Sequence, residues 1–126
     1  MSKYLIAFLM FWIVNTLPVV ASEWAKVSGD ELKAAVNNKQ WKSTDFTLHW
    51  RSDGKRLQEA NRGARRVDKW WIESDETTIC YKHKKLGTRC SNLEKKGDKY
   101  RMVVTKSGEG KGKKWKISIK DGIDDF

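Results

Sequence analysis

Short runs of alternating apolar and polar residues recur from residue 46 onward and restrict the folds open to this chain. Residues 46–51 alternate in this way, and residues 115–120 do the same near the C-terminus. Comparable runs recur about every 8–12 residues, with Gly, Asp and Asn between them. Because successive side chains of a strand face opposite sides of a sheet, each run supplies one apolar face to a shared core. The pattern predicts a mainly β domain, a small antiparallel meander that curves strongly or closes as a barrel.

The individual elements follow from the same pattern and from the turn residues between the runs. Strands are predicted at residues 46–51, 56–60, 67–73, 77–83, 86–93, 100–105 and 115–120. Asp53-Gly54 is typical of a tight hairpin between the first two of these strands. Ser28 and Glu31 have the spacing of a capping box, and apolar residues at helical spacing follow them. We therefore expect one short N-terminal helix over residues 29–37, which plugs the barrel.

The N-terminus has the order of a secretory signal peptide. Lys3 precedes an apolar run at residues 4–14, and small or β-branched residues lead to Ala21. The run of about eleven residues is short against the roughly 20 of a bilayer-spanning helix, which is the alternative interpretation. We expect residues 1–21 to be removed after Ala21, leaving residues 22–126 as a single β-rich domain in the periplasm or outside the cell.

The chain has two cysteines, Cys80 and Cys90. In an oxidising compartment an even cysteine count predicts a disulfide bond. The two residues are symmetric about Lys85, which places them either directly opposite or diagonally across one hairpin. Free thiols or half of a metal site are the alternatives, but no further Cys and no nearby His pair completes such a site. We predict no metal ion and no cofactor.

Several short motifs in the predicted mature domain occur in a fixed order. They are Gly29-x-Glu31-Leu32, Trp70-x-Ile72, Ile79-Cys80, Cys90 and Gly97-Asp98-x-Tyr100. In this order the chain resembles an uncharacterised family of small exported bacterial proteins, which pair a GxEL helix with a compact β-domain holding two cysteines. The resemblance implies a fold and a compartment, and it carries over no activity and no catalytic residues.

Residues for catalysis are sparse in the sequence. His49 and His83 are isolated within predicted strands, and no Ser or Thr has the strand-turn-helix setting of a nucleophile. The Gly-rich segment at residues 107–112 lacks the Gly-Lys-Ser/Thr ending of a phosphate-binding loop and lies between strands. The sequence therefore predicts a protein that is not an enzyme.

Basic residues outnumber acidic ones by 26 to 16, which gives a formal charge of +10. Basic clusters with aromatic residues among them can bind anionic polymers through charge and ring contacts. The candidate binding residues are Arg65, Arg66, Trp70, Trp71, Lys84, Lys85, Lys113, Lys114 and Trp115. Because Trp70 and Trp71 are adjacent in a strand, one of them should lie outside the principal core. The alternative is that the tryptophans form the core while the lysines keep a small domain soluble.

These observations favour an exported, non-catalytic binding or interaction module of the cell envelope. Its expected partners are anionic envelope polymers, lipid head groups or an acidic protein, with nucleic acid as an unspecific possibility. The alternative is a carrier that holds a small apolar ligand in a barrel cavity, which would form if inward-facing Trp50, Trp70 and Trp115 leave space. Binding that weakens steeply with salt would favour the first function, and salt-insensitive uptake of an apolar dye the second.

Overall fold

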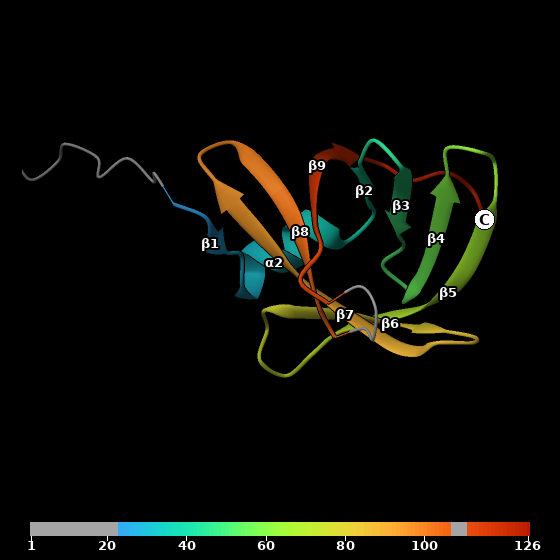
Figure 1. Ribbon diagram of the computed structural model, residues 1–126, viewed down its shortest axis with the longest axis horizontal. Coiled ribbons are helices and arrows are strands. Elements are labelled where there is room, and N and C mark those ends of the chain that lie inside the picture. The colour runs from blue at the N-terminus through green and yellow to red at the C-terminus, as the bar shows by residue number, and fades with distance from the viewer. Residues whose placement is uncertain (1–22, 107–110) are drawn as a thin grey trace, which may run out of the picture.

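The structure is a computed structural model that describes residues 23–106 and 111–126 (Figure 1). The predicted signal peptide at residues 1–21 and residues 107–110 of the Gly-rich segment lie outside the described residues. The elements are β1 Ala25–Lys26, α2 Gly29–Val36, β2 Lys39–Lys42, β3 Phe46–Trp50, β4 Lys55–Ala60, β5 Arg65–Ile72, β6 Thr78–His83, β7 Gly87–Lys96, β8 Lys99–Lys106 and β9 Lys114–Asp121.

Strands β2 to β9 form a closed antiparallel barrel, in which each strand pairs with the next one along the chain. Pairing of β2 with β9 closes the ring, with Lys39 opposite Asp121. The short strand β1 lies outside this ring and pairs with the far end of β7, where Ala25 faces Lys95. The prediction of a mainly β barrel with one short helix is therefore confirmed.

Local turn chemistry accounts for the hairpin between β3 and β4. Gly54 has a φ of 91°, a left-handed conformation that favours glycine, and its amide donates to the Arg51 carbonyl at 3.0 Å. A Cβ atom at Gly54 would also lie 3.7 Å from the carbonyl oxygen of Trp70, so the next strand packs closely against the turn. The Asp-Gly signal thus sets the register in which Trp50 pairs with Arg56.

Two short strands and one cap differ from the sequence prediction. Strands β1 and β2 were not predicted, because they are short and β2 has a single fully buried apolar residue, Trp41. Pairing on both sides, with β3 and β9, makes β2 a strand. The capping box at Ser28 is wrong, since the Ser28 side chain makes no cap hydrogen bond. The Gly29 amide instead donates to the carbonyl of Glu76, in the β5–β6 turn, at 3.0 Å.

Helix α2 closes one end of the barrel. Its buried residues Leu32 and Val36 join the main core, and the indole nitrogen of Trp41 donates to the Ala35 carbonyl at 2.8 Å. Edge-to-face contacts connect Trp41, Trp50 and Trp70, with ring centroids 4.9 and 5.5 Å apart. The core therefore fills the half of the barrel next to the helix. Among the described residues, no helix is long and apolar enough to cross a membrane.

A disulfide bond joins Cys80 in β6 to Cys90 in β7, as predicted. The two residues are directly opposed, with Cα atoms 4.1 Å apart, so the diagonal alternative is wrong. Both cysteines alternate with inward-facing residues of their strands, so their side chains face outward. Both are nevertheless buried. The bridge therefore ties the two strands together on the outer side of the barrel wall.

The C-terminal residues after β9 cover part of the outer wall, passing β3 and ending beside β4 and β5 (Figure 1). The amide of Asp124 donates to Nδ1 of His49 at 3.2 Å, and the Arg51 guanidinium lies 4.6 Å from the centre of the Phe126 ring. His49 and Leu57 face away from the barrel interior, yet each is only 1% exposed. The C-terminal segment thus makes a second, smaller buried layer outside the barrel.

Candidate binding cavity

A cavity of about 300 Å³ lies inside the barrel at the end opposite α2. Its walls come from the beginnings of β3, β7 and β9 and from parts of β4, β6 and β8. Its lining is cationic at Arg56, Arg89 and Lys113, uncharged polar at Gln58, Tyr81 and Ser91, and apolar at Phe46, Leu48, Met102, Val104 and Trp115. No carboxylate is among these lining residues.

Strand register explains why polar side chains reach the interior of this barrel. Leu48 and Trp50 face inward from β3, and their partners on β4 are Gln58 and Arg56. Directly paired residues of neighbouring strands point to the same face of the sheet. The polar strand β4 therefore presents an arginine and a glutamine to the inside, and β5 continues the row because Asp68 pairs with Arg56.

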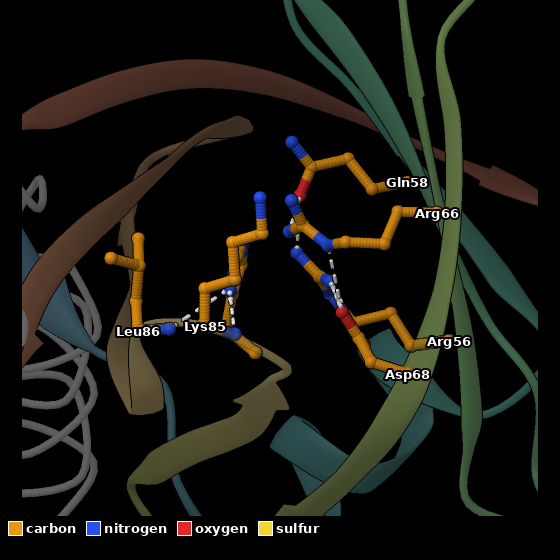
Figure 2. A network of polar contacts seen from close by, with 7 residues as sticks. Arg56, Gln58, Arg66, Asp68, Lys85 and Leu86 are labelled. Atoms are coloured by element: carbon orange, nitrogen blue, oxygen red, sulfur yellow. Dashed lines mark hydrogen bonds and ion pairs between the residues drawn. The ribbon is translucent and has the colours of Figure 1, made fainter.

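Arg56 is the most deeply buried charge of the cavity, at 2% exposure. Its Nη1 donates to both carboxylate oxygens of Asp68 at 3.0 and 2.9 Å, and its Nη2 donates to Oε1 of Gln58 at 2.9 Å (Figure 2). The guanidinium also lies 3.6 Å from the centre of the Tyr81 ring. Burial lowers the pKa of Arg56, and the Asp68 charge opposes this shift. The pair is thus a fully desolvated ion pair with a fixed geometry.

A second arginine shares the same acceptors. Nε of Arg66 donates to Asp68 at 3.3 Å, and its Nη2 donates to Oε1 of Gln58 at 2.8 Å (Figure 2). Because Oε1 of Gln58 accepts from both guanidinium groups, the amide nitrogen must point away from them, as a donor. One carboxylate therefore stands against two guanidinium groups, and the network keeps an excess of positive charge.

Two buried donors in this part of the barrel have no hydrogen-bond partner among the described residues. They are Nε of Arg56 and the indole nitrogen of Trp50. The two residues pair directly across β3 and β4, and the Arg56 guanidinium lies 5.3 Å from the Trp50 ring centre. A buried donor without a partner costs free energy, so this pair of donors is unusual.

The hairpin between β6 and β7 forms one side of the cavity entrance. Nδ1 of His83 accepts hydrogen bonds from the backbone amides of Lys85 and Leu86, each at 3.1 Å. Figure 2 shows Lys85 and Leu86 opposite the arginine network. Burial lowers the pKa of His83, and the charges of Arg66 and Arg89 lower it further. The charges of both arginines therefore act on the His83 imidazole, in addition to burial.

The predicted binding residues do not share one surface. Those inside or around the open end of the barrel are Arg66, Lys85, Lys113 and Trp115, and Lys84 lies in the same turn as Lys85. Arg65 and Lys114 lie on the outer side of the wall, since they alternate with inward-facing residues. Trp70 belongs to the core and its indole nitrogen donates to the Arg51 carbonyl at 2.8 Å, while Trp71 lies outside the core cluster, as the alternation of β5 predicts.

Sequence reasoning did not select Arg56, Gln58, Asp68, Tyr81 or Arg89 for the site. For Arg56 and Gln58, the Asp-Gly turn could have predicted an inward-facing position. Counting outward from that turn pairs Arg56 with Trp50 and Gln58 with Leu48, so a polar residue faces the same side as each apolar one. Residues on β6 and β7 gave no comparable signal, because their position depends on barrel closure.

A second group of potential ligands, His49, Glu59 and Asp124, lies on the outer wall. Nδ1 of His49 accepts from the Asp124 amide, so Nε2 carries the proton and donates to Glu59 at 2.6 Å. Coordination of a metal by Nε2 would move the proton to Nδ1, where it would face the Asp124 amide hydrogen. The arrangement fits a tether for the C-terminal segment better than a metal site. In the other group, with Glu73, both cysteines are held in the disulfide bond.

Comparison with protein families, with curated proteins and with solved structures found no match to this chain. The resemblance to a family of small exported proteins therefore stays a prediction.

Proposed function

We propose that this protein is an exported, non-catalytic binding module of the cell envelope that holds a small anion, or an anionic end group, in the open end of its barrel. The observation that supports the proposal is the cavity lining, which has three cationic side chains and no carboxylate. Such a lining offers many hydrogen-bond donors and concentrates positive charge at one end of the barrel.

The arginine network behind the lining adds to this preference. Asp68 compensates one positive charge, while Arg56 and Arg66 together carry two. Lys113 lies at the entrance, with its Nζ 5.8 Å from the centre of the Trp115 ring. An anion entering the cavity therefore meets attraction from several elements of the barrel. The net charge, +10 for the full chain and +9 after loss of Lys3 with the predicted signal peptide (10 − 1), extends this attraction into solution.

Export is part of the proposal. The predicted signal peptide and the disulfide bond both fit an oxidising compartment outside the cytoplasm. In the cell envelope, anionic groups belong to lipid head groups, to anionic polymers and to acidic proteins. The cavity has a volume of only about 300 Å³, so the proposed partner presents one anionic group to it rather than a broad surface.

Two neighbouring lysines give a direct test. Lys113 lines the cavity, whereas Lys114 faces outward, so Lys113→Glu and Lys114→Glu change the net charge equally at different places. We expect Lys113→Glu to weaken binding of benzoate or phenyl phosphate about tenfold or more, the effect of losing one charged hydrogen bond. Lys114→Glu should leave the affinity nearly unchanged. Tryptophan fluorescence titration at several salt concentrations measures both. Equal losses would mean that net charge alone attracts anions, and the proposal would be wrong.

A carrier of small apolar ligands is the second candidate. It is favoured by the opposite wall of the cavity, which is formed by Phe46, Leu48, Met102, Val104 and Trp115. Uptake of an uncharged apolar dye with no dependence on salt, together with no binding of anions, would favour this carrier over the proposed anion site.

A further inference from the structure

The strand order divides the turns between barrel strands among the two ends of the barrel. Because neighbouring strands are antiparallel, successive turns alternate between the ends. The connections at the open end, which has the cavity, are residues 43–45, 61–64, 84–86 and 107–113. Those at the end closed by α2 are residues 51–54, 73–77 and 97–98. Figure 1 shows the β4–β5 and β6–β7 turns on the same side of the molecule, on the right.

These two sets of turns differ in charge. The turns at the open end contain five basic residues, Arg62, Lys84, Lys85, Lys111 and Lys113, against two acidic ones. The acidic residues are Asp45 and Glu109, and Glu109 lies outside the described residues. The turns at the helix end contain one basic residue, Arg51, against five acidic ones, Asp53, Glu73, Asp75, Glu76 and Asp98. Net positive charge from the turns is therefore confined to the end with the cavity.

The two lysines of the β6–β7 turn have no internal counter-charge. Within the described chain, no ion pair or hydrogen bond uses the side chain of Lys84 or Lys85, and both residues are exposed. At the helix end, by contrast, Nζ of Lys33 lies 3.6 Å from a carboxylate oxygen of Glu76. An external anion at the β6–β7 turn therefore competes with no carboxylate of this protein.

Leu86 is an exposed apolar residue at the tip of the same hairpin. It is 64% exposed, and the hairpin from Thr77 to Leu93 contains four basic residues and no acidic one. Nδ1 of His83 accepts from the amides of Lys85 and Leu86, so the turn that presents these two side chains has a fixed shape. A leucine flanked by lysines fits the surface of an anionic bilayer, where the apolar group enters the head-group layer and the lysines contact phosphates.

The aromatic residues favour a lipid over a nucleic acid as the partner. Proteins that bind single-stranded nucleic acid stack the bases on accessible rings. Among the described residues, every Trp, Tyr and Phe is buried or half-buried, and the exposed large apolar residues are Val67 and Leu86. The apolar group that the β6–β7 turn exposes is therefore aliphatic, which suits a lipid interface better than a base.

We propose, resting on the proposed function above, that the anionic end group belongs to a lipid and that the protein docks on an anionic bilayer with the open end of its barrel toward the membrane. Leu86 enters the head-group layer, while Lys84 and Lys85 contact lipid phosphates. The cavity faces the same surface, so a head-group phosphate meets Lys113 at its entrance. The acidic turns of the helix end face away from the membrane, because the negative surface repels them.

Matched pairs of lysines at the two ends test this orientation. Lys84→Glu/Lys85→Glu and Lys96→Glu/Lys99→Glu change the net charge equally, and the second pair of exposed lysines flanks the β7–β8 turn at the helix end. On vesicles of equal parts phosphatidylglycerol and phosphatidylcholine, the first variant should bind at least about tenfold more weakly than the unaltered protein. The second should stay within about twofold, since its lysines face away from the membrane. Cosedimentation measures both. Equal losses would mean that net charge alone attracts the vesicles, and the proposal would be overturned.

Leu86→Ser tests the apolar contact. It should weaken vesicle binding about fivefold, because a polar side chain gains nothing in the head-group layer. Val67→Ser is the matched control, since Val67 is 46% exposed but lies on the outer side of β5, opposite Leu57. Neither change should alter benzoate binding in the cavity. Unchanged vesicle binding by Leu86→Ser would overturn the proposal, and so would binding of single-stranded DNA in place of vesicles.

Benzoate binding separates this proposal from the proposed function. If the unaltered protein does not bind vesicles while Lys113→Glu and Lys114→Glu differ in their affinity for benzoate, the anion site stands and the membrane orientation is wrong. If those two variants bind benzoate alike, the proposed function fails whatever the vesicles show. The measurements use protein from the exported fraction, with the loss of residues 1–21 checked by mass, because an apolar signal peptide would itself bind lipid.

Discussion

Arg56 lies among aromatic rings inside the barrel, and a guanidinium in that setting needs a counter-charge. Asp68 supplies it, with its own side chain only 3% exposed. Removing one partner of a buried ion pair leaves the other charge desolvated and unpaired, which costs more than the pair contributes. Both members of the pair are therefore needed for a stable fold, and the pair also contributes to the electrostatic character of the cavity.

The first residue-scale prediction concerns Asp68. Asp68→Asn should lower the free energy of unfolding by about 3 kcal/mol, because Arg56 would keep its charge without compensation. Asp98→Asn, in an exposed turn, removes the same charge and should change stability by less than about 0.5 kcal/mol. Urea unfolding measures both. Similar losses in the two variants would show that the buried pair has no special role.

A second residue-scale prediction concerns His83 and pH. Its pKa in the folded protein is lower than the ordinary value of 6.5, so between these two values the unfolded chain binds more protons. Stability should therefore fall as the pH drops from above 6.5 through the lowered pKa. A proton on Nδ1 would also break the two hydrogen bonds to Lys85 and Leu86.

His83→Asn removes this titration and keeps His49 in place. Urea unfolding between pH 7.5 and 5 should show a steeper loss of stability in the unaltered protein than in the variant. Parallel curves for the two proteins would contradict the role of His83.

Among the elements, β6 and β7 depend on a covalent link. The disulfide bond closes a loop of 10 residues between directly opposed positions. Replacing Cys80 and Cys90 by Ser should lower the free energy of unfolding by about 2–3 kcal/mol through the entropy of the unfolded chain. Thermal unfolding measures this loss, and peptide mapping without reductant checks the link. A double Ser variant as stable as the parent would show that strand pairing alone holds this hairpin.

Most elements could be predicted from the sequence because each has a local signal. Strand β3 alternates strictly, and the turn at Gly54 fixes its partner. The symmetry of one hairpin about Lys85 predicts that Cys80 and Cys90 lie across from each other, and the structure shows which of the two open arrangements, direct or diagonal, they adopt. By contrast, β2 has one buried apolar residue, and its strand conformation depends on β9, which lies far away in the sequence.

The cavity was less predictable than the strands for a related reason. Arg56 and Arg66 look like ordinary basic residues of polar strands until the ring closes and one side becomes the interior. Lys113 and Lys114 are neighbours in sequence, yet strand alternation sends them to opposite sides of the wall. The clusters of charge in the sequence therefore predicted a basic site and some of its members, such as Arg66 and Lys113, but not Arg56, Gln58 or Asp68.

At the scale of the whole molecule, the interior is divided between two uses. The half beside α2 is a dry core of tryptophan, leucine and valine, and the half away from it is the charged cavity. Core packing around Trp41 and Trp50 stabilises the barrel. The polar network in the other half becomes buried only when the ring of strands is closed. The C-terminal segment adds a buried layer on the outside, over His49 and Leu57.

Pairing of β2 with β9 also determines when the cavity comes into existence. In the barrel, every other pairing joins strands that are consecutive in the chain, so those hairpins can form early and independently. The contact of Lys39 with Asp121 must wait for the last strand, which also carries Trp115 to the cavity wall. The cavity would therefore form only in the final step of folding, and under the proposed export that step would follow translocation of the last strand. A ligand present at that stage would bind only the closed barrel. It would therefore stabilise the pairing between the first and last strands of the barrel against opening.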